Sequence, residues 1–188
     1  MSFRARRRKN RNQRELLLWM FTLLAAGMTA ACILIFIGER TKVIGSSMEP
    51  KLQDGNQVIL DKITYRFQKP KRFEIVVFPG PEGEKQFYVK RIIGLPGETV
   101  EITRGKVYIN GQEISVDYAK DHITPNGDLT KAVVLGKDEY FVMGDNRNNS
   151  RDSRYLEVGP VKRSEIIGRV IFRIYPWKQA GRINKDEL

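Results

Sequence analysis

Residues 86–94 read Gln-Phe-Tyr-Val-Lys-Arg-Ile-Ile-Gly, a short run of β-branched and aromatic residues that ends at a glycine. Runs of this length and composition are typical of strands, because such side chains pack well on a pleated, half-buried surface. Side chains in a strand alternate between its two faces. Tyr88, Lys90 and Ile92 should therefore share one face, which gives Lys90 apolar neighbours.

The chain after residue 43 repeats this pattern, with short apolar runs separated by Gly, Pro, Asn and Asp. The runs predict strands at Gln57–Leu60, Glu74–Phe78, Gln86–Ile93, Thr99–Ile102, Lys106–Ile109, Tyr140–Met143 and Ile167–Tyr175. Asn110-Gly111 is a strong signal for a two-residue β-hairpin. We predict a mostly β body that forms one domain over residues 39–188, because a chain of 188 residues is short for two independent cores.

The N-terminal region is of a different kind. Seven of the first fourteen residues are Arg or Lys, and residues 16–38, LLLWMFTLLAAGMTAACILIFIG, carry no charge. About 20 apolar residues suffice for a helix to span a bilayer, so this segment predicts a transmembrane helix. Basic residues beside a membrane span stay in the cytoplasm. Residues 1–15 are therefore expected in the cytoplasm, and the body is expected on the extracytoplasmic side of the cell membrane as a single-pass type II protein.

Three other interpretations fit this region less well. A cleaved signal peptide has a shorter apolar core, of about 7 to 15 residues. A lipoprotein signal at Cys32 would give way to a polar linker, whereas here the apolar run continues. A basic arm that binds nucleic acid by charge would not need to adjoin a membrane segment. We expect contact with membrane lipid and none with nucleic acid.

The chain contains one cysteine, Cys32, and one histidine, His122. The exported body therefore has no disulfide and must be stabilised by burial. A site with several histidine ligands is excluded, and we expect no metal and no cofactor. His122 lies in the polar stretch 117–131, where a solvated loop residue is the simpler interpretation.

Residues 43–52 read VIGSSMEPKL, a turn of small residues with two hydroxyl groups. Serines next to glycine usually only shape turns, so Ser47 needs a base if it is to react. A lysine can serve where histidine is missing, provided that its amine is neutral near the working pH. Burial on an apolar strand face would lower the pKa of Lys90 in this way. In the alternative, Lys90 lies at a strand edge with its charge in water.

A third polar segment, residues 144–154, reads GDNRNNSRDSR and follows a predicted strand. A calcium loop is excluded, because the Asp/Asn alternation and closing Glu of an EF-hand are missing. A solvated loop remains possible on composition alone. We predict instead a rigid scaffold in which Arg and Asp pair and a serine orients an amine.

Four segments, in this order, resemble the type I signal peptidases of bacteria, the serine-lysine enzymes of peptidase family S26. They are Gly45-x-Ser47-Met48-x-Pro50, Phe73–Phe78, Tyr88-Val89-Lys90-Arg91-x-x-Gly94-x-Pro96-Gly97 and Gly144-Asp145-Asn146-Arg147-x-x-Ser150-x-Asp152-Ser153-Arg154. The resemblance implies a signal-peptidase-like catalytic domain, a β-sheet coiled into a barrel, after one transmembrane helix. It implies a membrane-bound serine endopeptidase that removes signal peptides from exported preproteins.

The same resemblance implies roles for individual residues. Ser47 would be the nucleophile, Lys90 the general base, and Ser150 the serine that positions the lysine. Asp152 with Arg154, and Asp145 with Arg91, would brace the site. The backbone N–H of Ser47 would stabilise the oxyanion. Substrate contacts would come from Ile44, Gly45, Met48, Leu52, Tyr88 and Val89.

Two positions depart from the family pattern. Gly45 stands where some members carry a serine that supplies a second oxyanion donor, and Glu74 replaces a more usual aspartate. Preprotein signal peptides are the implied partners, near the protein translocation machinery. Phe172, Tyr175 and Trp177 could lie at the membrane surface or in the core.

Rival interpretations remain at this point. A self-cleaving repressor would share the serine and lysine but would carry a DNA-binding domain in place of residues 16–38. A non-enzymatic, membrane-tethered β-domain that binds proteins or anionic lipid would leave both residues without a chemical role. The C-terminal Lys185-Asp186-Glu187-Leu188 spells a retention signal, which we take as coincidence in a chain with bacterial motifs.

Overall fold

The computed structural model describes residues 13–29, 38–81, 86–114, 123, 127 and 131–183. The chain divides into two compact units, residues 1–38 and 39–188. His122, Cys32 and residues 184–188 lie outside the described residues, as does most of the basic head.

In the first unit, residues 13–29 are helical. Among the described residues, no helix combines the length and the apolar character needed to cross a bilayer. The transmembrane helix predicted for residues 16–38 is therefore not found in this part of the chain, and residues 30–37 of that prediction lie outside the described residues.

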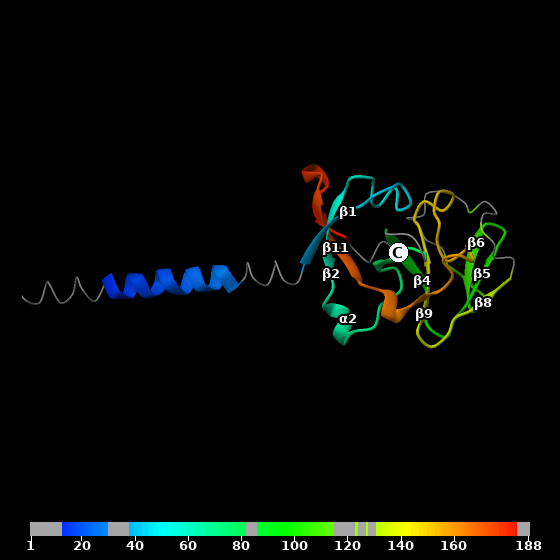
Figure 1. Ribbon diagram of the computed structural model, residues 1–188, viewed down its shortest axis with the longest axis horizontal. Coiled ribbons are helices and arrows are strands. Elements are labelled where there is room, and N and C mark those ends of the chain that lie inside the picture. The colour runs from blue at the N-terminus through cyan, green and yellow to red at the C-terminus, as the bar shows by residue number, and fades with distance from the viewer. Residues whose placement is uncertain are drawn as a thin grey trace, which may run out of the picture. The chain divides into compact units, whose positions relative to one another are not determined.

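The second unit is mostly β, as predicted. Within the described residues its larger sheet has eight strands in the order β1-β2-β11-β3-β4-β9-β10, with β12 beside β11. Figure 1 labels five of them: β1, β2, β11, β4 and β9. The strands are β1 Gly38–Lys42, β2 Gln57–Asp61, β3 Ile75–Pro79, β4 Phe87–Gly94, β9 Glu139–Met143, β10 Val161–Lys162, β11 Gly168–Tyr175 and β12 Gly181–Arg182. Because β4 pairs with β3 on one side and β9 on the other, both antiparallel, Lys90 lies on an interior strand.

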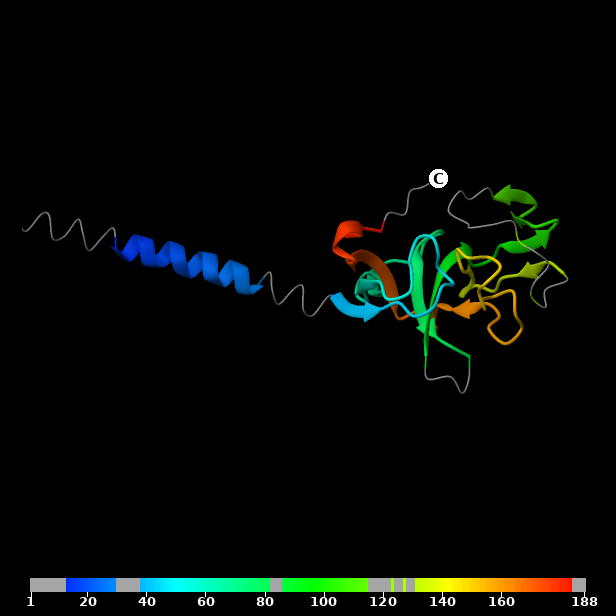
Figure 2. The same cartoon turned by 90° about the horizontal axis from the view of Figure 1, so that it is seen from above.

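A smaller sheet has four described strands in the order β7-β6-β5-β8. Its first strands, coloured green, lie at the right of Figure 2. Its strands are β5 Thr99–Thr103, β6 Lys106–Ile109, β7 Gln112–Ile114 and β8 Val133–Val134. Asn110 and Gly111 join β6 to β7, with φ of 51° and 80°. These left-handed conformations are what a two-residue hairpin turn requires, so the predicted hairpin is confirmed.

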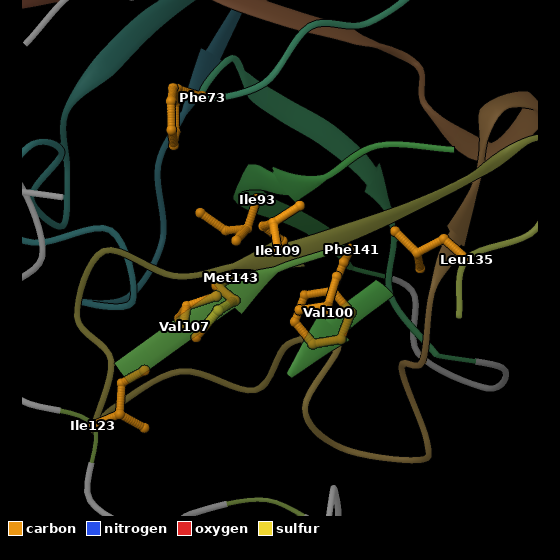
Figure 3. Close-up of a cluster of buried hydrophobic side chains, with 9 residues drawn as sticks. All are labelled: Phe73, Ile93, Val100, Val107, Ile109, Ile123, Leu135, Phe141 and Met143. Atoms are coloured by element: carbon orange, nitrogen blue, oxygen red, sulfur yellow. The ribbon is translucent and has the colours of Figure 1, made fainter. Parts of the chain in front are cut away.

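The two sheets share a hydrophobic core (Figure 3). Phe141 and Met143 of β9 pack there against Val100 of β5 and Val107 of β6. Both β9 side chains are fully buried, and burying each such side chain contributes about 1.5 to 3 kcal/mol. This core holds β9 in place, and the polar segment 144–154 begins directly after that strand.

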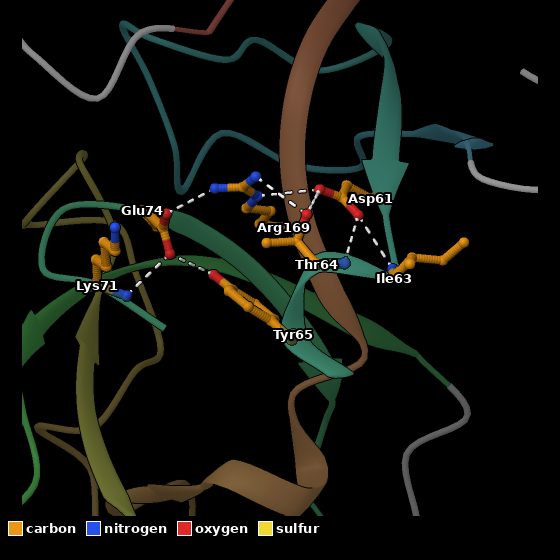
Figure 4. A network of polar contacts seen from close by, with 7 residues as sticks. All are labelled: Asp61, Ile63, Thr64, Tyr65, Lys71, Glu74 and Arg169. Carbon is orange, nitrogen blue, oxygen red and sulfur yellow. Dashed lines mark hydrogen bonds and ion pairs between the residues drawn. The ribbon is translucent and has the colours of Figure 1, made fainter. Parts of the chain in front are cut away.

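A polar network joins β2, β11, the short helix α2, Thr64–Phe67, and Glu74, the residue before β3 (Figure 4). Glu74 accepts hydrogen bonds from the Tyr65 hydroxyl at 2.7 Å and from Arg169 at 2.9 Å. Asp61 accepts the backbone N–H of Ile63 and of Thr64, which satisfies donors at the start of the helix. Glu74, the departure from the family pattern, is therefore a buried structural residue. Two 3₁₀ turns, η1 Arg163–Glu165 and η2 Trp177–Gln179, complete the described elements.

Candidate active site

Ser47 lies in the loop between β1 and β2. Gly45 precedes it with φ of +86°, a conformation that glycine adopts without strain. The Ser46 carbonyl accepts the Glu49 N–H at 3.1 Å, which closes a turn with Ser47 as its second residue. Two side chains of the same loop, Met48 and Leu52, are buried in the core and anchor it. The Ser47 hydroxyl therefore lies on a loop whose position is fixed by side chains buried in the core.

Lys90 reaches this hydroxyl from β4. Its Nζ lies 2.8 Å from Ser47 Oγ, within hydrogen-bond distance. The Lys90 side chain is 4% exposed, and its Nζ also lies 5.0 Å from the centre of the Tyr88 ring. The structure therefore brings together the two residues that the sequence singled out, and the alternative of a solvated lysine at a strand edge is wrong.

Burial has a direct chemical consequence for Lys90. Removal of the ammonium from water lowers the pKa of Lys90 to about 8, with Arg154 acting in the same direction and the carboxylates of Asp152 and Asp145 opposing it. A substantial fraction of the amine is then neutral near pH 8, and a neutral amine can accept the proton of a hydroxyl.

Ser150 and Asp152 lie behind this pair. The Ser150 hydroxyl donates to Asp152 Oδ2 at 2.7 Å, and the same oxygen accepts the Gly144 N–H at 2.9 Å. Arg154 completes the group by donating to both carboxylate oxygens of Asp152, at 2.8 and 2.9 Å. The expected hydrogen bond between Ser150 and Lys90 is not among the contacts of the described residues. Because the Ser150 hydroxyl donates its hydrogen bond to Asp152, its oxygen can still accept one, and Ser150 lines the cleft.

Arg91 and Asp145 form the second predicted pair. Two parallel hydrogen bonds of 2.8 and 2.7 Å join the guanidinium to the carboxylate, and both side chains are buried. Arg91 also donates to the Phe73 carbonyl at 2.9 Å. Planar, bidentate pairs of this kind fix geometry as well as charge. This pair connects β4, which carries Lys90, to the polar segment after β9.

A cleft of about 650 Å³ opens beside Ser47 and Lys90. Four of the predicted substrate contacts line it: Ile44, Gly45, Tyr88 and Val89. Met48 and Leu52 do not line it, because they are 1% and 0% exposed and belong to the core under the loop. The expectation that these two contact substrate is replaced by a packing role.

Three residues contact the loop that carries Ser47, although the sequence assigned them no role there. The Asn146 N–H donates to the Ser47 carbonyl at 3.0 Å, and the Asn149 side chain donates to Ser46 Oγ at 2.8 Å. A Cβ added at Gly144 would lie 2.5 Å from both the Ser47 carbonyl oxygen and Ser150 Cβ. All three belong to the segment 144–154. Gly144 and Asn146 belong to the motif of the family resemblance, which gave them no role, and only the polarity of the segment pointed to Asn149.

Within the described ranges, no cluster of three or more His, Cys, Asp or Glu side chains could hold a metal ion. The groups gathered at the cleft are a hydroxyl, a buried amine and hydrogen-bond donors. Such an arrangement can carry out nucleophilic attack on a carbonyl with proton transfer to the amine.

Comparisons with known proteins show a family and several proteins that the chain is similar to. The family described as signal peptidase, peptidase S26, matches residues 15–177. A protein of Synechocystis sp. (strain ATCC 27184 / PCC 6803 / Kazusa) named "Probable signal peptidase I-2" is 38% identical over 170 residues, which are 88% of this chain and 76% of that protein. Signal peptidase I of Leptolyngbya laminosa is 38% identical over 155 residues, 79% of this chain and 74% of that protein. A crystal structure of a signal peptidase I from Enterococcus faecalis V583 is 40% identical and covers 54% of this chain and 97% of its own, with a TM-score of 0.44.

Proposed function

The chain belongs to the signal peptidase family, peptidase S26, and is a serine endopeptidase that cleaves signal peptides; we propose that Ser47 is its nucleophile and Lys90 its general base. The observation that carries this assignment is the 2.8 Å contact between Lys90 Nζ and Ser47 Oγ at the wall of the cleft. Family membership displaces the two rival interpretations, a non-enzymatic β-domain and a self-cleaving repressor.

The reaction then runs in two halves. Neutral Lys90 accepts the Ser47 proton while Oγ attacks the scissile carbonyl, and the Lys90 ammonium gives that proton to the leaving amine. An acyl-enzyme ester on Ser47 remains. Water attacks this ester as Lys90 accepts one of its protons, and the proton returns to Ser47 Oγ as the ester breaks.

The Ser47 N–H is our candidate for the oxyanion donor. It makes no hydrogen bond to any described residue, so it is available to a developing negative charge in the cleft. Gly45 offers no hydroxyl for this purpose, and its own N–H is engaged by Asp54 Oδ1 at 2.8 Å. One preorganised backbone donor is worth about 10² to 10³ in rate.

We propose that the ion pairs Asp152–Arg154 and Asp145–Arg91 hold the catalytic dyad, Ser47 and Lys90, in place. We also propose that Ile44, Tyr88 and Val89 contact the signal peptide. Val89 and Tyr88 lie on the strand that carries Lys90, and Ile44 lies on the loop that carries Ser47. A peptide in the cleft would therefore contact both reacting elements at once.

We also propose that residues 16–38 anchor the peptidase in the cell membrane, with residues 1–15 in the cytoplasm and residues 39–188 on the extracytoplasmic side. The support is the uncharged apolar run beside seven basic residues. Trp177, 78% exposed and in ring contact with Tyr175, is a further candidate for contact with lipid rather than core. On this side of the membrane the enzyme would meet preproteins as they leave the translocation machinery.

Two experiments test these proposals. Purified protein in detergent should cut a preprotein at its signal-peptide boundary, read by mass, and Ser47→Ala should abolish that cut; cleavage by Ser47→Ala at the wild-type rate would refute the assignment. Protease added to spheroplasts should digest residues 39–188, and full protection of that region would refute the topology.

A further inference from the structure

We propose that Asn146 is a positioning residue that aims the Ser47 N–H at the oxyanion, by holding the two carbonyl groups on either side of the Ser47 Cα. This inference rests on the proposed function of Ser47 and extends it to the residue that orients the nucleophile's own peptide group.

Two hydrogen bonds from Asn146 carry the inference. Its side-chain Nδ2 donates to the Ser46 carbonyl at 3.1 Å, and its backbone N–H donates to the Ser47 carbonyl at 3.0 Å. The peptide planes before and after Ser47 are therefore both held by one residue. Asn146 is itself 6% exposed, so solvent does not compete strongly for these donors.

The direction of the Ser47 N–H follows from peptide geometry. The Ser46–Ser47 peptide is not among the cis peptide bonds of the described residues, so it is trans. In a planar trans peptide the C=O and the N–H point in opposite directions. Because Asn146 holds the Ser46 carbonyl on the side of the polar segment, the Ser47 N–H points away from that segment, where no described residue accepts it.

The Ser46 carbonyl has a second donor, the Glu49 N–H at 3.1 Å. That bond lies within the turn, so it shapes the turn but cannot place it relative to the rest of the protein. The Asn146 side chain comes from a position 100 residues later in the chain. The Asn146 side chain therefore fixes the position of the turn relative to the rest of the domain.

A chain of contacts also connects Asn146 to the general base, Lys90. Asp145, the neighbour of Asn146, is held by Arg91, the neighbour of Lys90. A closed circuit thus runs from Lys90 through Arg91, Asp145 and Asn146 to Ser47, and the 2.8 Å contact between Lys90 and Ser47 closes it. Loss of the Asn146 side-chain donor keeps the backbone bond to the Ser47 carbonyl but releases the Ser46 carbonyl. The Ser46–Ser47 peptide, which carries the oxyanion donor, then loses its link to Asn146.

The test uses Asn146→Ala and Asn146→Asp in the full-length enzyme. Both remove the Nδ2 donor and keep the backbone N–H, and Asn146→Ala does so without adding charge. The matched control is Asn110→Asp in the distant hairpin. Among the contacts of the described residues, only the oxygen of the Asn110 amide is used there, as acceptor of the Thr99 N–H. Ser47→Ala in the same assay reports on the proposed function itself.

We expect kcat for a signal-peptide substrate to fall by about 10²-fold in both Asn146 variants, with KM changed by less than about threefold, because the oxyanion forms only in the transition state. A peptide aldehyde forms a hemiacetal with the serine, and the oxygen on its tetrahedral carbon occupies the place of the oxyanion. Both Asn146 variants should bind this aldehyde more weakly than wild type does, but should bind the cleaved signal peptide as wild type does. Asn110→Asp should match wild type.

Three outcomes would overturn the inference: kcat near the wild-type value in both variants, a rise in KM with kcat unchanged, or equal losses of affinity for aldehyde and product peptide. If Ser47→Ala is inactive while the Asn146 variants keep their kcat, only this inference fails. If Ser47→Ala is active, the proposed function fails as well.

Discussion

Lys90 Nζ and Ser47 Oγ lie 2.8 Å apart although 43 positions separate them in the chain. β4 supplies the amine from the interior of the sheet, and the loop between β1 and β2 supplies the hydroxyl. Little water reaches the amine at this position, since Lys90 is 4% exposed. The same burial that would be a cost in an ordinary protein makes the lysine a usable base at moderate pH.

The pH dependence of cleavage tests this directly. Burial lowers the pKa of Lys90 to about 8, so the amine is protonated and inactive below that pH and neutral above it. We expect kcat/KM to rise by about tenfold per pH unit at low pH and to level off above about pH 8. The measurement is a rate profile from about pH 6 to about pH 10 with a signal-peptide substrate.

A rate that still rises by about tenfold per pH unit up to about pH 10, as expected for a lysine with the free pKa of about 10.4, would contradict this mechanism. Lys90→Arg provides the control, because a guanidinium does not lose its proton in proteins. That variant should be inactive across the whole range.

The Arg91–Asp145 pair should also contribute to the stability of the fold. Asp145→Ala leaves a guanidinium buried without its carboxylate, and breaking a buried pair by removing one partner costs about 3 to 5 kcal/mol. We expect the free energy of unfolding, measured in denaturant, to fall by about that amount. Glu157→Gln removes one partner of the exposed pair Arg151–Glu157 and should leave it unchanged. Equal effects of the two substitutions would show that burial is not the cause.

Gly144 is expected to tolerate no side chain. A Cβ there would lie 2.5 Å from the Ser47 carbonyl oxygen and from Ser150 Cβ, so Gly144→Ala must push the nucleophile loop and Ser150 apart. Overpacking of this kind costs about 1 to 3 kcal/mol, and a displacement of about 1 Å can lower the rate by about 10²-fold. Thermal unfolding and kcat measure the two effects.

Gly181→Ala is the matched control, because a Cβ at Gly181 would meet no atom within 4 Å. If Gly144→Ala retains wild-type kcat, the close packing of Gly144 against Ser47 and Ser150 does not position the catalytic residues.

Most of the fold could be predicted from the sequence, because the large strands bury β-branched and aromatic residues in regular runs. The prediction for Lys106–Ile109 coincides with β6, and that for Thr99–Ile102 differs from β5 by one residue. Short strands such as β8, β10 and β12 were missed, since two residues carry no periodicity. Their conformation is set by the strands with which they pair.

The site was predictable in its reactive groups and less so in its surroundings. The motifs pointed to Ser47 and Lys90, and alternation placed Tyr88 beside the lysine. They did not distinguish apolar loop residues that face the cleft, such as Ile44, from those that face the core, such as Met48. Nor could they reveal that Asn146 bonds a carbonyl 100 residues away, because that contact depends on how the polar segment folds back.

The most direct test of the serine-lysine assignment is the cleavage rate of a preprotein by Ser47→Ala, Lys90→Ala and the double variant, each first shown to be folded by its thermal unfolding. If the two side chains act as one unit, each single substitution should lower the rate by about 10⁴-fold or more, and the double variant should be no slower than either. A folded Lys90→Ala or Ser47→Ala variant that cleaves at the wild-type rate would contradict the assignment.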